Sequence, residues 1–128
     1  MRALKRLAAV TRRLFLVRKL RATEARADRL EAHARECRAQ ARAYWGEAQL
    51  AGRAGRDLSN LARDAYSQVG DEHHETIADY RRKAGEELHA AEIYDEMAGE
   101  RSADAYESEK WAAEAREQAA AIRRKLSA

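Results

Sequence analysis

The chain has no proline and a single cysteine, and its 128 residues include one phenylalanine and two tryptophans. One cysteine, Cys37, cannot form an intrachain disulfide, so a reducing, cytoplasmic setting is the simplest expectation. No apolar run reaches the roughly 18 residues that a membrane-spanning helix needs, so we expect none. The β-branched residues that build strands are scarce and scattered, which disfavours a sheet.

Strong helix formers dominate what is present. Alanine supplies 30 residues, and charged residues make up 37% of the chain. A composition rich in Ala, Glu, Lys, Leu and Arg is typical of long helices and coiled coils. The sequence therefore predicts an all-α protein.

One stripe of residues with 3–4 spacing begins at Leu16 and continues for many turns. An average spacing of about 3.5 keeps such a stripe, which we call the seam, against a partner helix. Most members are small, so each buries little area and the pairing has to be long. Gly52 and Gly55 suggest a hinge near 52–57. The seam comprises Leu16, Leu20, Thr23, Ala27, Leu30, Ala34, Cys37, Ala41, Tyr44, Ala48, Ala51, Gly55, Leu58, Ala62, Ala65 and Val69.

Two glycines predict where helices end. Gly70 suits a C-terminal cap, with Asp71 as the next N-cap and Glu72 in the first turn. Gly99 followed by Ser102 predicts a second stop. Helices near 72–98 and 103–126 would then form an antiparallel hairpin. The last of them repeats the 3–4 spacing through Ala105, Ser108, Ala112, Ala115, Ala119, Ile122 and Leu126.

The expected organisation has three parts: a basic amphipathic N-terminal segment (residues 1–22), a coiled-coil-like helix (23–69) and an acidic helical hairpin (71–128). The two stops also echo each other, because Tyr66 with Gly70 and Tyr94 with Gly99 recur at offsets of 28 and 29 residues. This pattern resembles tetratricopeptide helix pairs, which repeat every 34 residues or so, but it lacks their terminal proline. We interpret it as ordinary helix–turn–helix spacing.

Charge is distributed unevenly along the chain. Residues 1–23 carry eight basic residues and no acid, whereas residues 70–117 carry fifteen acidic and six basic residues. This polarity suggests a basic arm for an acidic partner, or pairing between copies. Solvated helix faces are the alternative for the acidic half. The eight candidate partner-binding residues are Arg2, Lys5, Arg6, Arg12, Arg13, Arg18, Lys19 and Arg21.

Residues 2–21 form a basic amphipathic helix when placed on a helical wheel, with Leu4, Leu7, Val10, Leu14 and Phe15 on one side. This helix has three interpretations: it lies on an anionic membrane, grips nucleic-acid phosphates, or packs its apolar face on another helix. The stretch TRRLFLV is similar to a twin-arginine export signal. Its apolar part ends after four residues at Arg18, which is too short for such a signal.

Candidate metal ligands are few. Glu86 and His89 have Glu-x-x-His spacing, which resembles ferritin-like di-iron bundles, but the second copy that such a site needs is missing. The adjacent His73 and His74 point in different directions on a helix, which disfavours a shared metal. His33 and Cys37 are four residues apart and suit zinc only in a symmetric dimer. We expect no metal, no cofactor and no catalytic site.

These observations predict a non-enzymatic, scaffold-like assembly protein, which self-associates through its helices as a homo-oligomer or within a larger protein assembly and docks an acidic partner with its basic N-terminus. The alternative is a peripheral membrane- or nucleic-acid-binding helical protein. Large side chains in small-residue seams concentrate packing energy, and they are the expected interface residues. They are Leu30, Cys37, Tyr44, Trp45, Leu58, Tyr94, Tyr106 and Trp111.

Overall fold

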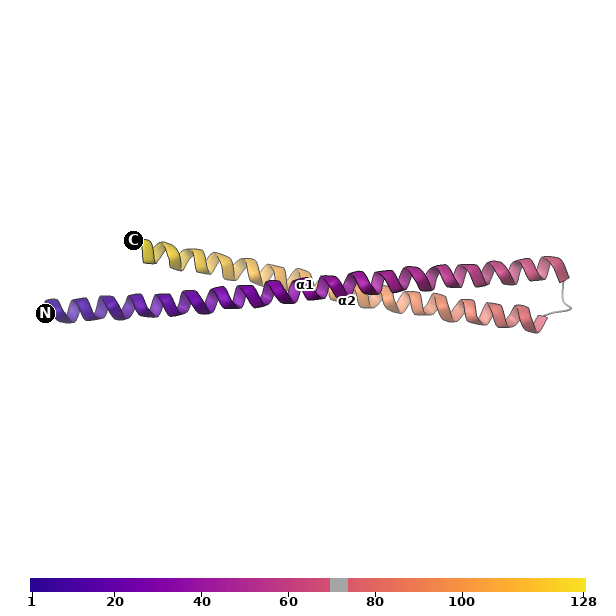
Figure 1. The fold of residues 1–128 in the computed structure, drawn as a ribbon, viewed down its shortest axis with the longest axis horizontal. Coiled ribbons are helices and arrows are strands. Elements are labelled where there is room, and N and C mark those ends of the chain that lie inside the picture. The colour runs from indigo at the N-terminus through magenta and orange to yellow at the C-terminus, as the bar shows by residue number, and fades with distance from the viewer. Residues whose placement is uncertain (70–73) are drawn as a thin grey trace. The chain divides into compact units, whose positions relative to one another are not determined.

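The computed structural model describes residues 1–69 and 74–128, which form two α-helices (Figure 1). Helix α1 runs from Arg2 to Val69 and α2 from His74 to Ser127, and these described residues include no strand. The prediction of an all-α protein with a long first helix is confirmed, and a single second helix packs against the first. The cap residues expected at Gly70, Asp71 and Glu72 lie outside the described residues.

The two helices pair in two compact units, and each unit takes a part of both helices. Unit 1 comprises Met1–Cys37 and Ala103–Ala128, and unit 2 comprises Arg38–Ser102. In unit 1, Glu24 pairs with Arg123 and Glu31 with Arg116, so the two helical segments run antiparallel. In unit 2 the segments are antiparallel as well, because Gly52 lies against Ala91 and Gly55 against Leu88.

The core lies along the seam. Every member from Leu16 to Ala65 is buried or half-buried. Helix α2 supplies the matching stripe, in which every seventh residue is buried or half-buried: Ile77, Ala84, Ala91, Ala98, Ala105, Ala112 and Ala119. A seven-residue period in both helices keeps the two stripes facing each other along their length.

Small residues in both stripes let the helices approach closely. The clearest case is Gly55, where an added Cβ would stand 2.7 Å from Leu88 Cγ and 3.2 Å from the Ala84 carbonyl oxygen. Larger side chains fill the gaps between the alanines, and Tyr44 stacks on Tyr94 with ring centroids 6.3 Å apart. Within residues 1–68 and 74–128, Ser108 is the only buried polar residue, and it is 8% exposed.

The helix end predicted at Gly99 and Ser102 is wrong, because α2 passes through both residues without a break. The seven-residue period continues from Ala98 to Ala105, so packing against α1 holds this stretch helical at a cost of about 1 kcal/mol for the glycine. Residues 74–98 and 103–126 are therefore parts of one helix, which packs on α1 rather than on itself. Without a turn at Gly99, the helix–turn–helix repeat has no second copy.

The hinge expected near 52–57 is also replaced by continuous helix, because α1 includes all these residues. Gly52 and Gly55 are both buried rather than exposed at a bend. The role of Gly55 is steric, because an added Cβ there would collide with the Leu88 side chain, whereas at Gly52 it would make only ordinary contacts. Gly55 thus marks a close approach of the two helices and not the break that its residue type suggests.

Candidate docking surface at the N-terminal segment

No described residue covers the apolar side of the N-terminal segment. Five side chains, which we call the apolar stripe, are exposed over more than half of their surface: Leu4 (69%), Leu7 (63%), Val10 (56%), Leu14 (57%) and Phe15 (64%). All residues from 1 to 15 are exposed. Side chains of this size are the ones that normally contribute most to a core, so packing of this face on another helix does not occur among the described residues.

The apolar stripe and the seam lie on opposite sides of α1. Leu16 and Leu20, which open the seam, are half-buried, whereas Leu14 and Phe15 just before them are exposed. At 3.6 residues per turn, Leu7 and Leu14 lie roughly half a turn from the side on which Leu16 and Leu20 meet α2. The stripe therefore faces away from the second helix of unit 1.

The C-terminal end of α2 meets α1 at Arg13. The Arg13 Nη1 donates a hydrogen bond to the carbonyl oxygen of Leu126 over 3.4 Å, and this oxygen is one of those that a helix end leaves without an internal partner. A groove of about 300 Å³ opens beside this contact. It is lined by Ala9, Arg12, Arg13, Leu16, Lys125, Leu126 and Ala128.

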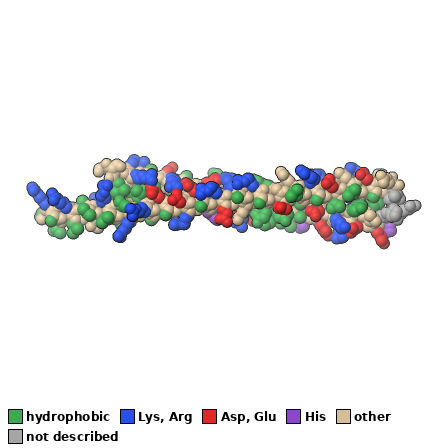
Figure 2. Space-filling view, in the orientation of Figure 1, with side chains coloured by type: hydrophobic (Ala, Val, Ile, Leu, Met, Phe, Trp, Pro, Cys, Tyr) green, Lys and Arg blue, Asp and Glu red, His purple; other side chains and the backbone are tan. Residues whose placement is uncertain are grey.

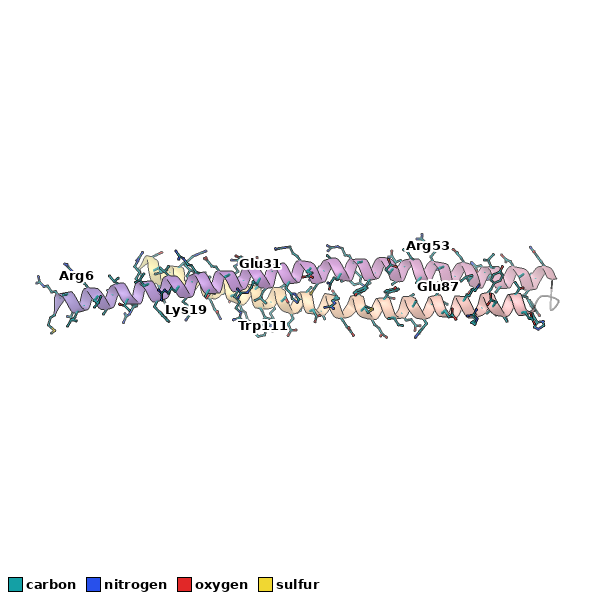
Figure 3. The ribbon with its side chains drawn as sticks, turned by 60° about the horizontal axis from the view of Figure 1, so that its bottom comes forward. Arg6, Lys19, Glu31, Arg53, Glu87 and Trp111 are labelled. Atoms are coloured by element: carbon teal, nitrogen blue, oxygen red, sulfur yellow. The ribbon has the colours of Figure 1, made fainter. Side chains whose placement is uncertain are left out.

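Positive charge from both helices gathers at this end of unit 1. All eight predicted partner-binding residues of α1 are exposed, and the last turn of α2 adds Arg124 and Lys125. Figure 2 shows basic and hydrophobic side chains together on the visible face of the N-terminal part of α1. In Figure 3, Arg6 lies on the part of α1 that α2 does not accompany, and Lys19 lies beside the last turns of α2. The basic C-terminal turn of α2 thus lies beside the basic N-terminal segment, although the two stand at opposite ends of the sequence.

The predicted interface residues divide into two groups. Cys37 is buried, and Leu30, Tyr44, Leu58 and Tyr94 are half-buried, so these five pack between the two helices. The other three are more exposed, since Trp45 is 44%, Tyr106 69% and Trp111 43% exposed. This second group offers the larger aromatic surface to a partner.

Ion pairs across the two helices were missed by the sequence interpretation. The Arg116 guanidinium donates to Glu31 Oε1 over 3.0 Å and to Asp28 Oδ1 over 2.5 Å, and Arg123 pairs with Glu24. The hydrogen bond from Arg116 lowers the pKa of the Glu31 carboxyl and raises the pKa of the guanidinium itself. A signal was present, because Glu24, Glu31, Arg116 and Arg123 each follow a seam residue directly, the position from which coiled coils form such pairs.

The candidate metal ligands do not come together. Glu86 accepts a hydrogen bond from Arg82 over 2.8 Å, and His89 Nδ1 is 3.9 Å from Glu92. Cys37 Sγ is 3.5 Å from His33 Nε2, and the two are joined by no third ligand. Within residues 1–69 and 74–128, no group of three or more His, Cys, Asp or Glu side chains is placed to hold a metal. His73 lies outside the described residues.

Neither of the described helices has a stretch apolar and long enough to cross a membrane. Comparison with known proteins finds no match to this chain among family models, curated proteins or solved structures.

Proposed function

We propose that this protein is a non-enzymatic, scaffold-like interaction protein that docks an acidic partner through its N-terminal segment. The observation that carries the proposal is the exposed apolar stripe together with eight basic residues and no acid in residues 1–23. Exposing large apolar side chains to water in one contiguous row costs a monomer free energy. Such rows mark interaction surfaces. Basic side chains around the row select an acidic partner and accelerate the encounter.

The test compares two triple variants that lose the same charge. In Lys5→Gln/Arg6→Gln/Arg12→Gln the loss falls on the N-terminal segment, and in Arg42→Gln/Arg53→Gln/Arg56→Gln it falls on exposed positions of unit 2. We expect only the first variant to lose retention on immobilised polyglutamate at about 0.15 M salt, where charges interact over roughly 8 Å. Equal loss in both variants would show that net charge alone binds, and the docking proposal would fail.

We further propose that copies associate through outward-facing aromatic side chains, since α2 covers the seam within one chain. Trp45, Tyr106 and Trp111 expose between 43% and 69% of their surface, and aromatic residues are enriched among interface hot spots. Absolute mass from light scattering on a size-exclusion column is expected to be that of a dimer or a larger species. Mass that falls with salt would indicate pairing of basic and acidic segments, and a monomer at both low and high salt would contradict the proposal.

A further inference from the structure

We infer that the acidic partner of the N-terminal segment is an anionic lipid surface, on which the segment lies as a helix in the plane of the headgroups. The inference rests on the proposed function and names the partner. It starts from the apolar stripe, whose five members lie within Leu4–Phe15 and are 56–69% exposed. A helix whose apolar face sinks a few ångströms below the headgroups, with Lys and Arg on its other face, binds membranes in this way.

Four basic residues stand at the edges of the apolar stripe or opposite it, as such a helix needs, whereas Arg18 lies on the stripe's own side beyond Phe15. Arg6 and Arg12 border the apolar stripe on its two edges, and Lys5 and Arg13 lie further toward the opposite side. Long Lys and Arg side chains extend their charge toward the headgroups while their methylene stems cover apolar surface. A helix is about 10 Å wide, which is close to the Debye length, so the basic groups on its far side still feel an anionic surface.

The packing of unit 1 leaves the stripe free to approach a flat surface. Because the stripe and the seam are on opposite sides of α1, α2 lies on the side away from the bilayer. The basic C-terminal turn of α2, with Arg124 and Lys125, adds charge near the same end. The proposed orientation therefore requires no rearrangement of the contacts between α1 and α2.

A nucleic acid fits this surface less well than a lipid membrane does. Phosphates of a nucleic acid would be held by the basic side, where Arg13 already donates to Leu126 and where Arg12 and Arg13 line the groove at the end of α2. They would leave the apolar stripe in water, because a phosphate backbone is recognised by charge. An anionic bilayer engages the charge and the apolar stripe together.

The experiment is flotation of the full chain with vesicles of phosphatidylcholine containing about a third phosphatidylserine, and with pure phosphatidylcholine vesicles. We expect flotation only with the anionic vesicles. Leu7→Gln/Leu14→Gln should weaken that binding at least about tenfold, because two apolar side chains no longer enter the bilayer. The matched control is Leu50→Gln/Leu61→Gln, which changes two leucines of unit 2 that are 59% and 50% exposed and should leave binding unchanged.

The result that overturns the inference is equal binding by the wild type and Leu7→Gln/Leu14→Gln, because charge alone would then account for the attraction. Absence of flotation with retained binding to polyglutamate or to a short DNA duplex would also overturn it, and an acidic protein or a nucleic acid would take the place of the lipid. Absence of all three interactions would remove the docking proposal itself. Circular dichroism of both double variants in buffer checks that neither change affects the fold, as expected for exposed side chains.

Discussion

Units 1 and 2 are built from the same two helices, but their described contacts between helices differ in kind. In unit 1, Arg116 and Arg123 of α2 reach the carboxylates of Asp28, Glu31 and Glu24 beside a seam of alanines. In unit 2, Leu88 fills the space that Gly55 leaves, and Tyr44 stacks on Tyr94. Its ion pairs among Asp79, Arg82, Lys83 and Glu86 run along α2.

The two units show that the alignment of two helices along one seam can be fixed in two ways. Alanine seams bury little and discriminate poorly between registers, so a second feature has to fix the alignment. Charged pairs beside the seam do this in unit 1, where a shifted register would separate Arg116 and Arg123 from their carboxylate partners. Steric fit does it in unit 2, because Leu88 has room only opposite a glycine.

Each unit contains one tryptophan, Trp111 in unit 1 and Trp45 in unit 2. The fluorescence of Trp45→Phe and Trp111→Phe variants therefore follows the unfolding of each unit separately.

The largest effect is expected from a charge in the seam of unit 1. Ala27 is fully buried, so Ala27→Glu forces a carboxylate between the helices and lowers the free energy of unfolding by about 3 kcal/mol or more. Denaturant titration followed by Trp111 fluorescence measures the loss. The control is Ala25→Glu, two residues away and exposed, with an expected change within about 0.5 kcal/mol. Similar losses for the two variants would contradict the assignment of the seam.

A smaller effect is expected from a single methyl group in unit 2. Gly55→Ala places a Cβ 2.7 Å from Leu88 Cγ, and overpacking of about 1–3 kcal/mol outweighs the gain of about 1 kcal/mol in helix propensity. At Gly99 an added Cβ has no neighbour within 4 Å, so Gly99→Ala should stabilise the helix by about 0.5–1 kcal/mol. Thermal unfolding by circular dichroism compares the two variants, and a gain from both would show that Gly55 is not a site of close approach.

The smallest effect is the dependence on pH. Because the pKa of Glu31 is lowered in the folded chain, its contribution is fully present above the ordinary value of 4.5 and is lost as the pH falls through the folded-state pKa. Arg116→Gln should therefore reduce the acid-induced loss of stability in unit 1, as followed by Trp111. Arg82→Gln is the matched control in unit 2, where the Arg82 hydrogen bond lowers the pKa of Asp79. This variant should reduce the acid-induced loss of stability in unit 2, as followed by Trp45. These groups are exposed, so both differences should shrink with added salt. An effect of Arg116→Gln on Trp45 as large as on Trp111 would contradict the separation of the units.

The sequence predicted the seam more accurately than it predicted the ends of the helices. Spacing alone identified residues such as Ala27, Ala34 and Ala112, because a seven-residue period has one structural solution in a helix pair. The helix end predicted at Gly99 was wrong. A glycine weakens a helix in isolation but is tolerated where packing on both sides maintains the helix. The candidate docking residues of the N-terminal segment were found from charge and amphipathicity, whereas the ion pairs of Arg116 and Arg123 depend on residues 85 to 99 positions apart.

Local propensity and the 3–4 spacing along one helix are enough to predict the helical class and the buried face of each helix. They also predict the basic amphipathic character of residues 2–21. Only the tertiary structure identifies the helix that covers the seam. Two alanine stripes of equal period can pair within one chain or between two chains, and the spacing does not distinguish these cases. Among the described residues the apolar stripe is uncovered, since α2 lies on the other side of α1. Its exposure depends on which side of α1 the second helix covers, and that side is set by the pairing of distant residues.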